Sequence, residues 1–381
     1  MHYTVVADDL TGAADSAARC LSAGLRARVS LGGGASAWYD VEALDAATRH
    51  MPPATAAEVV AGVVKRCLEM GAMEVYKKVD SVLRGNVGAE LEAAMRAAGA
   101  ELALLCPSFP EQGRTVVGGH LLVNGAPVSA TPLGREVGMT SYVPEILGAQ
   151  TSLTVGLLAL QSVRSGSDAI VRELKALGRS GAMIVVADAC SGEDLSAIAD
   201  GARVLGRSCL LAGSAGLISA LAPHWAGELP PPQVLVVVGS LHPAARAQVR
   251  LLLEREPCAL VRTGNDERPD DSSRVIVLLT PDEGMEGDHV GELAKRAAQV
   301  VRSCRVSGMV VTGGDSARAV LEAIGASGVV LLGEALPGLP YGRLVGGDYE
   351  GMPVATKAGS FGDAEALWRA IIKLEEMAGE R

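Results

Sequence analysis

The sequence predicts an α/β protein of two domains, each a mostly parallel sheet flanked by helices. Short apolar runs alternate with Ala-rich stretches of helical spacing through almost all of the 381 residues, which is typical of parallel sheets with helices on their faces. The length allows two or three domains at about 150 residues each. Three consecutive prolines at 230–232 interrupt the alternation, and such stretches often mark a domain boundary. We therefore place one domain at residues 1–228 and a second at residues 232–381.

Apolar runs and helical spacing predict the elements of the first domain. The runs predict strands at 3–7, 74–77, 102–106 and 183–187, and the spacing predicts helices at 13–23, 56–70 and 89–98. The helix at 56–70 has the clearest apolar stripe, formed by Val59, Val60, Val63, Val64, Cys67 and Leu68. Residues 113–151 are rich in Gly, Pro and Thr without a clear period, so a long loop and a small antiparallel excursion both stay open.

The alternation restarts after the prolines. Strands are predicted at 234–238, 275–279 and 309–312, and a helix is predicted after Pro243. The second domain is therefore expected to repeat the layout of the first, with a parallel sheet and helices on its faces.

Charge and composition exclude several classes of function. The chain has 34 basic and 44 acidic residues, a net charge of −10 and only 3% aromatic residues. It therefore lacks the basic stripe that DNA binding needs and the aromatic surfaces that stack on single-stranded nucleic acid. No apolar run approaches the ~18 residues of a membrane span, and the N-terminus lacks the basic region of a signal peptide. We expect a cytoplasmic protein without nucleic-acid or membrane partners, and a homo-oligomer stays open.

Metal and disulfide chemistry find no support in the residue spacing. The seven cysteines include no pair at metal-finger or CxxC spacing and have apolar neighbours, which predicts reduced thiols inside the cores. His50, His120 and His242 show no metal-ligand spacing either.

The first candidate site follows the strand at 3–7. Asp8 and Asp9 end this strand, and Thr11 and Gly12 open the next helix. Ligands of open parallel sheets bind beyond the carboxyl ends of strands, and a helix start has free N–H groups that can receive an anion. The alternative is that Asp9 or Thr11 only caps the helix.

The second candidate site lies at another junction between a strand and a helix. Lys78, Asp80, Ser81 and Arg84 fall within seven residues. An Asp beside a Lys can bind a hydroxyl and accept its proton while the cation holds an anionic group. The alternative is a solvated loop with ordinary surface pairs.

Two weaker signals belong to the same domain. Arg49 suits a bidentate grip on a carboxylate, although a lone arginine is more often a surface residue. The stretch 106–115, Cys-Pro-Ser-Phe-Pro-Glu-Gln-Gly-Arg-Thr, follows a predicted strand and is a candidate wall of a substrate cleft.

Three Gly-rich turns mark the second domain. They contain Ser240, the run Gly313, Gly314, Asp315 and Ser316, and Gly359. Glycine lets the backbone approach a phosphate, and a helix N-terminus supplies aligned N–H donors. Neither GxxxxGK[ST] nor GxGxxG occurs in the chain, which disfavours P-loop and ordinary dinucleotide-binding proteins.

Taken in order, these motifs resemble those of the four-carbon acid sugar kinases, which are ATP-dependent enzymes acting on tetronates. The matching segments are ADDLTGAADSA from Ala7, KKVDSVLRGNVG from Lys77, CPSFPEQGRT from Cys106, VVVGS to Ser240, TGGDSA from Thr312 and KAGSFG from Lys357. The resemblance implies an N-terminal sugar-acid-binding domain, a C-terminal nucleotide-binding domain and an active site in the cleft between them.

The resemblance also implies a role for each candidate residue. The sugar acid is expected to contact Asp9, Arg49, Lys78, Asp80, Ser81 and Arg84, and ATP is expected to contact Ser240, Gly313, Gly314, Asp315, Ser316 and Gly359. The expected reaction phosphorylates the terminal hydroxyl of threonate, erythronate or 3-oxo-tetronate, with Mg²⁺ on the ATP phosphates and Asp80 or Asp9 as the catalytic carboxylate. The protein ligands of the metal stay open. The alternatives are a non-catalytic sugar-acid sensor and a nucleotide-cofactor oxidoreductase on a similar hydroxy acid.

Overall fold

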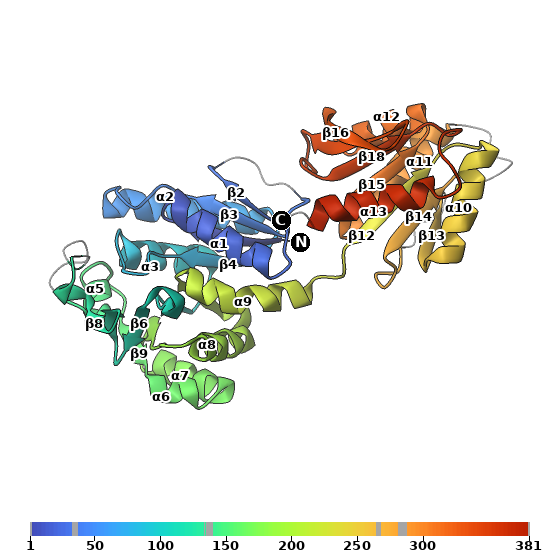
Figure 1. Ribbon diagram of the computed structural model, residues 1–381. Helices are drawn as coiled ribbons and strands as arrows, with labels where there is room; N and C mark the ends of the chain where they lie inside the picture. Colours follow the sequence, from blue (N-terminus) through green and yellow to red (C-terminus); the bar gives the residue numbers. More distant parts are fainter. Residues whose placement is uncertain are drawn as a thin grey trace. The chain divides into compact units, whose positions relative to one another are not determined.

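A computed structural model describes residues 2–32, 37–132, 134, 140–263, 268–280 and 288–379 of the chain. The chain forms two compact units, each built on its own sheet (Figure 1). The first unit extends to Glu228, apart from a short segment that ends at Trp38. The second unit consists of Leu229–Arg381 together with that segment.

An eight-stranded sheet in the order β2-β3-β1-β4-β11-β5-β10-β9 forms the centre of the first unit. All its neighbouring strands are parallel. The strands are β1 (His2–Ala7), β2 (Ala27–Ser30), β3 (Val41–Asp45), β4 (Ala72–Lys78), β5 (Leu102–Cys106), β9 (Val155–Leu158), β10 (Ile184–Ala187) and β11 (Cys209–Gly213). Every residue of β5 is buried, as expected for a parallel strand that is covered on both faces.

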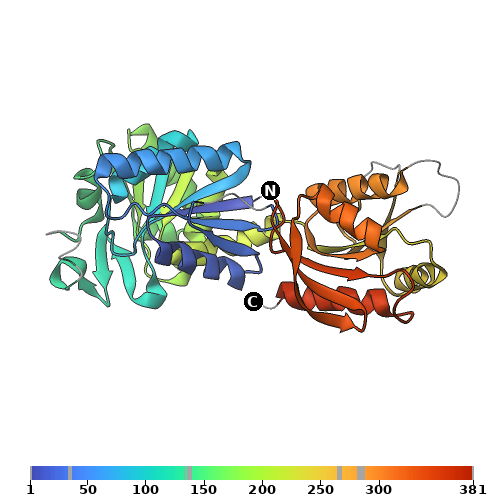
Figure 2. The same cartoon turned by 90° about the horizontal axis from the view of Figure 1, so that it is seen from above.

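Helices cover both faces of this sheet, with α1 and α2 on opposite sides (Figure 2). They are α1 (Leu10–Ser22), α2 (Pro53–Glu69), α3 (Val87–Ala98), α5 (Val143–Gly148), α6 (Leu160–Arg164), α7 (Ser167–Arg179), α8 (Gly192–Leu205) and α9 (Ala215–Glu228). Three short 3₁₀ turns are η1 (Pro110–Gln112), η2 (Val128–Ala130) and η3 (Gly206–Ser208). On one face the stripe of α2 packs into a core with α3, in which Val60, Val63, Val64 and Cys67 are buried.

The predicted helices begin two or three residues too late, because a helix starts at its cap and not at its first apolar residue. Helix α1 begins after Asp9, whose side chain accepts a hydrogen bond from the Gly12 N–H, and α2 begins at Pro53. Proline is favoured in a first helical turn because its missing N–H would have no partner there. The predicted strand at 102–106 matches β5, and those at 3–7, 74–77 and 183–187 differ from β1, β4 and β10 by one or two residues at one or both ends.

The segment 113–151 contains the small antiparallel excursion rather than a long loop. Strands β6 (Arg114–Val117), β7 (His120–Val123) and β8 (Ala126–Pro127) form a three-stranded antiparallel sheet. Residues 133 and 135–139 of this segment lie outside the described residues.

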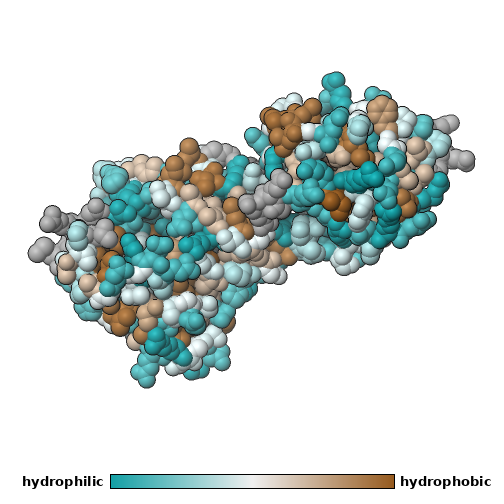
Figure 3. Space-filling view, viewed as in Figure 1, coloured by the Kyte–Doolittle hydropathy of each residue, from teal (hydrophilic) through white to brown (hydrophobic). Residues whose placement is uncertain are grey.

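The second unit has a seven-stranded sheet in the order β13-β14-β12-β15-β18-β17-β16. The strands are β12 (Gln233–Val238), β13 (Cys258–Arg262), β14 (Val275–Leu279), β15 (Val306–Thr312), β16 (Gly328–Leu336), β17 (Leu339–Val345) and β18 (Pro353–Lys357), and the helices are α10 (Pro243–Arg255), α11 (His289–Ser303), α12 (Gly314–Ala323) and α13 (Ala366–Gly379). Five strands are parallel, whereas β16 and β17 add an antiparallel edge. The edge strand β16 exposes Val330, Leu331 and Leu332, and hydrophobic atoms gather where it lies in Figure 3.

In both sheets, successive strands are added first on one side of the first strand and then on its other side. In the first unit, β2 and β3 lie on one side of β1, and β4 lies on the other. In the second unit, β13 and β14 lie on one side of β12, and β15 lies on the other. Ligands of open α/β sheets bind at such a switch point, beyond the carboxyl ends of the strands. The fold therefore points to one site after β1 and β4 and to another after β12 and β15.

No helix among the described residues is long and apolar enough to cross a membrane. All seven cysteines are described, and they are free thiols, of which Cys190 and Cys258 are half-buried and the rest buried.

Candidate active site

The strand register brings the candidate residues of the first unit to one level. Ala7 at the end of β1 pairs with Asp45 of β3 and with Lys78 of β4. Lys78 pairs in turn with Gly213 of β11. The segments that follow these strands therefore meet at one edge of the sheet.

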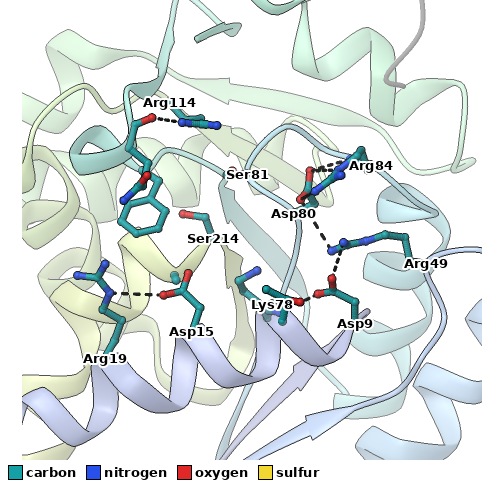
Figure 4. A pocket seen from close by; sticks show the side chains of 15 residues that line it. Asp9, Asp15, Arg19, Arg49, Lys78, Asp80, Ser81, Arg84, Arg114 and Ser214 are labelled. Atoms are coloured by element: carbon teal, nitrogen blue, oxygen red, sulfur yellow. Dashed lines mark hydrogen bonds and ion pairs between the residues drawn. The ribbon is translucent and has the colours of Figure 1, made fainter. Parts of the chain in front are cut away.

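A cavity of about 260 Å³ opens at this edge (Figure 4). Its walls contain all the residues predicted to bind the sugar acid: Asp9, Arg49, Lys78, Asp80, Ser81 and Arg84. The other lining residues are Thr11, Gly12, Asp15, Arg19, Phe109, Gln112, Arg114, Ser214 and Ala215. Segments that are far apart in the sequence thus form one polar pocket.

Arg49 joins the two carboxylates at the end of β1. Its Nε and Nη2 donate to the Asp8 carboxylate at 2.8 and 3.0 Å, and its Nη1 donates to Asp9 Oδ2 at 2.6 Å. Asp8 is buried and does not line the cavity, so its expected place next to a ligand is wrong. The role that the structure gives Asp8 is to hold Arg49.

Asp9 has both of the roles that the sequence left open. Its Oδ1 accepts a hydrogen bond from the Gly12 N–H at 2.8 Å and so caps α1, while its carboxylate also lines the cavity. The Gly12 N–H is therefore occupied, and the expectation that it is free to receive an anion is wrong.

Asp80 is held by the loop that follows it. Its Oδ2 accepts hydrogen bonds from the Val82 N–H at 3.1 Å and from Arg84 Nε at 3.1 Å, and its Oδ1 accepts one from Arg84 Nη2 at 2.8 Å. Arg49 Nη2 lies 3.8 Å from the same Oδ1. Burial raises the pKa of Asp80, but the hydrogen bonds and charges of Arg84 and Arg49 outweigh it, so the pKa is lowered overall.

Lys78 places a buried ammonium group beside these carboxylates. Its Nζ donates to the Val79 carbonyl oxygen at 2.9 Å. Burial lowers the pKa of Lys78, and the negative charges of Asp8, Asp80 and Asp9 oppose this effect. A Cβ on Gly12 would lie 2.9 Å from Lys78 Nζ, so the first turn of α1 can approach the ammonium only because residue 12 is glycine.

Arg19, Arg114 and Ser214 are lining residues that we did not predict as site residues. Arg114 belongs to the stretch 106–115, which was predicted only as a wall. Ser214 follows β11 and caps α9 by accepting a hydrogen bond from the Gly216 N–H at 3.0 Å. The signal for Ser214 was the run LLAGSAG at 210–216, another apolar strand that ends in a small-residue turn.

The three Gly-rich turns of the second unit come together at its own switch point. A Cβ on Gly359 would overlap Ser240 Oγ, and a Cβ on Gly239 would overlap Ser316 Oγ. The Gly313 N–H donates to the Lys357 carbonyl oxygen at 2.8 Å. The turns after β12, β15 and β18 are therefore in direct contact, and their glycines permit it.

Two buried side chains organise the turn after β18. Lys357 Nζ donates to the carbonyl oxygens of Ala358 and Phe361 at 2.8 and 2.9 Å. Gln248 Nε2 donates to the carbonyl oxygens of Phe361, Gly362 and Asp363 at 3.1, 3.2 and 2.8 Å. Burial lowers the pKa of Lys357. Because the buried side chains of Lys357 and Gln248 bind these carbonyl oxygens, the negative ends of the peptide dipoles face the protein interior and not a ligand.

The two adjacent glycines after β15 differ in conformation. Gly313 has a φ of 100°, which side chains of L-residues rarely adopt. Gly314 is the first residue of α12, has no such φ, and a Cβ there would meet no atom within 4 Å. A side chain at residue 314 would therefore not strain the backbone, and the constraint lies at residue 313.

No cluster of three or more metal-ligating His, Cys, Asp or Glu residues occurs in the described part of the chain. Asp315 in the first turn of α12 offers one carboxylate.

Two family models match the chain. The model described as Sugar-binding N-terminal domain matches residues 3–221, and the model described as Nucleotide-binding C-terminal domain matches residues 256–367. A D-threonate kinase of Bordetella bronchiseptica is 36% identical over 404 residues, which cover 98% of this chain and 97% of the relative. The chain belongs to the four-carbon acid sugar kinase family. The resemblance seen in the motifs is thereby confirmed.

Other members of the four-carbon acid sugar kinase family match over a similar length. A D-threonate kinase of Salmonella typhimurium is 33% identical and covers 99% of each chain. A 3-oxo-tetronate kinase of Pseudomonas fluorescens is 30% identical and covers 97% of this chain and 96% of its own. A crystal structure from Bordetella bronchiseptica, with bound citrate and described as a domain-swapped dimer, matches with a TM-score of 0.53 and 34% identity over 99% of each chain.

This protein is thus a sugar-acid kinase, a phosphotransferase with a nucleotide-binding domain. The cavity of the kinase lies within the part that matches the sugar-binding model. Gly313–Ser316 and Gly359 lie within the part that matches the nucleotide-binding model, and Ser240 precedes that part.

Proposed function

We propose that this kinase transfers the γ-phosphoryl group of ATP to the terminal (4-) hydroxyl of a four-carbon sugar acid such as threonate, erythronate or 3-oxo-tetronate. The observation that supports it best is the cavity at the β1/β4 switch point, where three carboxylates and five cations face a space of about 260 Å³. D-threonate is the first substrate to test, because the relatives with 36% and 33% identity given above bear its name.

The sugar acid binds to Asp9, Arg49, Lys78, Asp80, Ser81 and Arg84 in this proposal. Asp9 and Asp80 accept hydrogen bonds from its hydroxyl groups. Phosphoryl transfer depends mainly on positioning and charge neutralisation, so a carboxylate that orients the attacking hydroxyl is sufficient. The lowered pKa of Asp80 keeps it ionised at neutral pH and suits this orienting role, and Asp9 is the competing candidate.

ATP binds to the turns of the second unit, at Ser240, Gly313, Gly314, Asp315, Ser316 and Gly359. The start of α12 supplies backbone N–H groups for a phosphate, and the absence of a side chain at residue 313 lets the phosphate approach the backbone. Mg²⁺ bound to the phosphates neutralises part of their charge, and Asp315 is our candidate for its protein ligand. Transfer then takes place in the cleft between the two domains.

We also propose that the protein forms a homo-oligomer, because a relative crystallised as a domain-swapped dimer. Size-exclusion chromatography with light scattering tests this proposal.

A combined assay tests the proposed function. Each four-carbon acid is added with and without Mg-ATP, and both the melting temperature and the release of ADP are measured, because a ligand of the native state raises its melting temperature. We expect stabilisation by at least one acid and ADP release with the same acid. Stabilisation without ADP release would favour the sensor. Absorbance changes with a nicotinamide cofactor would favour an oxidoreductase.

A further inference from the structure

The cavity carries more positive than negative side chains. Its lining cations are Arg19, Arg49, Lys78, Arg84 and Arg114, and its lining carboxylates are Asp9, Asp15 and Asp80. An anionic ligand therefore fits the cavity, and the carboxylate of a sugar acid needs a partner among these cations. Their hydrogen bonds show which cation is available.

Two of the cations bind the carboxylates at the ends of β1 and β4, and a third lies beside them. Arg49 binds Asp8 and Asp9, and Arg84 binds Asp80 through two nitrogen atoms. Lys78 donates to a backbone carbonyl oxygen and stands among the same carboxylates. The carboxylate of a ligand at this end of the cavity would face Asp9 and Asp80, which repel it.

Arg19 also has acidic partners. Its Nη1 donates to Glu111 at 2.8 Å, and its Nε lies 3.7 Å from Asp15. Both carboxylates are well exposed to solvent, so these pairs are weak. Arg19 is therefore the competing candidate.

Arg114 differs from the other three arginines of the cavity, each of which has a carboxylate partner. No carboxylate of the described residues pairs with it, and its Nε is buried without a hydrogen-bond partner among them. Its side chain donates only to the Gln112 carbonyl oxygen. A buried donor without a partner is costly, so a carboxylate that the arginine turns to meet would relieve this cost.

The backbone of Arg114 is fixed before any ligand binds. It exchanges two hydrogen bonds with Phe109, at 2.7 and 3.1 Å, and is paired with Val123 in the β6–β7 hairpin. Figure 4 shows Arg114 above Ser214, on the side of the cavity away from Asp9 and Lys78. A four-carbon acid has its carboxylate at one end and hydroxyl groups along its chain, which matches a cation at one side and two carboxylates at the other.

We infer that Arg114 binds the carboxylate of the sugar acid and thereby selects acids over neutral polyols. This inference rests on the proposed function and names one residue of its substrate specificity. Guanidinium and carboxylate can form two parallel hydrogen bonds, whereas the CH₂OH group of a tetritol offers no charge to pair with.

The test compares each acid with the tetritol in which CH₂OH replaces the carboxylate. For each acid we measure kcat/KM. For the tetritol we measure kcat/KM or, if it is not turned over, its Ki as a competitive inhibitor. Both ligands are tested with the wild type, Arg114→Gln, Arg114→Lys and Arg19→Gln. We expect Arg114→Gln to lower kcat/KM for the acid by roughly 10- to 100-fold, the range for hydrogen bonds to charged groups, and to leave the tetritol value within about 2-fold. Arg114→Lys should keep part of the preference because it keeps the charge, and it serves if the Gln variant does not fold.

Two results would overturn the inference. One is an equal loss for acid and tetritol in Arg114→Gln, which indicates a structural role. The other is a loss of the acid preference in Arg19→Gln but not in Arg114→Gln. If the wild type turns over no four-carbon acid, the proposed function fails. Calorimetric titration of the acid then tests separately whether Arg114 binds its carboxylate. A Kd unchanged by Arg114→Gln, or no binding to the wild type, rejects the inference.

Discussion

Arg49 and Asp8 form a bidentate ion pair, with Nε to Oδ2 at 2.8 Å and Nη2 to Oδ1 at 3.0 Å. The Asp8 side chain is 4% exposed and that of Arg49 is 11% exposed. The pair joins the carboxyl end of β1 to the segment after β3, and the same guanidinium also holds Asp9. Asp8 therefore positions two cavity residues without lining the cavity itself.

Replacing Asp8 by Asn should destabilise the protein and weaken acid binding. The variant leaves Arg49 with one charged partner fewer in a buried place, and breaking such a pair costs about 2–4 kcal/mol. Thermal unfolding measures the stability, and titration with the acid measures its Kd. Asp15→Asn is the control for stability, because Asp15 is 40% exposed and lies 3.7 Å from its partner Arg19. Equal melting temperatures for the two variants would contradict the role of Asp8.

Asp80→Asn should lower kcat by roughly 10²- to 10⁴-fold, the usual range for a positioned acid or base, if Asp80 orients or deprotonates the hydroxyl. Because the folded-state pKa of Asp80 is lowered, the stability that its ionised form contributes is present above the ordinary pKa and is lost only as the pH falls through the lowered value. The wild-type rate should therefore show no titration of Asp80 near neutral pH. The rate is followed by coupled ADP release, and the fold by circular dichroism. An unchanged rate would assign the role to Asp9.

Gly313→Ala should weaken ATP binding more than Gly314→Ala does. Residue 313 has a φ of 100°, at which a side chain costs roughly 1–3 kcal/mol or shifts the turn, whereas residue 314 has open space around it. Calorimetry with ATP and with the acid separates the effects, because acid binding in the first unit should survive in both variants. The opposite order, or parallel loss of both ligands, would contradict the assignment of this turn.

Glu74→Gln should raise the melting temperature at neutral pH. The Glu74 carboxylate accepts a hydrogen bond from Trp225 Nε1 at 3.1 Å, but its burial raises its pKa. The folded state therefore holds its proton more tightly than the unfolded state, so Glu74 reduces stability as the pH rises from its ordinary pKa through the raised value.

The gain from Glu74→Gln should therefore shrink as the pH is lowered through that window. Melting temperatures of the variant and the wild type across a pH series measure this. Glu69→Gln is the control, because Glu69 is 64% exposed and pairs only weakly with Lys65 at 3.9 Å. A gain that does not depend on pH would show that the effect is not electrostatic.

Local apolar runs predicted seven of the strands, but the buried strands β3 and β11 were not predicted. Buried parallel strands such as β5 are continuous apolar runs, and their polar ends at Asp9 and Lys78 predicted the cavity. Short edge strands were not predicted, because β2 has only four residues, half-buried or exposed apart from Ser30. The antiparallel hairpin of β16 and β17 was not predicted either, since its exposed apolar residues follow no period of two.

The hydrogen-bond and ion-pair partners of the site residues depend on tertiary contacts, so they could not be predicted from the sequence. The resemblance implied that Arg49 binds a ligand, yet nothing in the sequence showed that Asp8, 41 positions earlier, occupies two of its nitrogen atoms. Ser214 reaches the cavity only because β11 inserts between β4 and β5. No local sequence pattern predicts that β11 lies between β4 and β5.

The two switch points have a consequence for how the ligands add to the enzyme. Every residue that lines the cavity belongs to the first unit, and the contacts among the three Gly-rich turns all belong to the second. Neither group of contacts needs the other ligand to be present. If the acid and ATP bind as proposed, we expect either substrate to add first, and we expect a change of cavity side chains to alter the choice of acid without changing the affinity for the nucleotide.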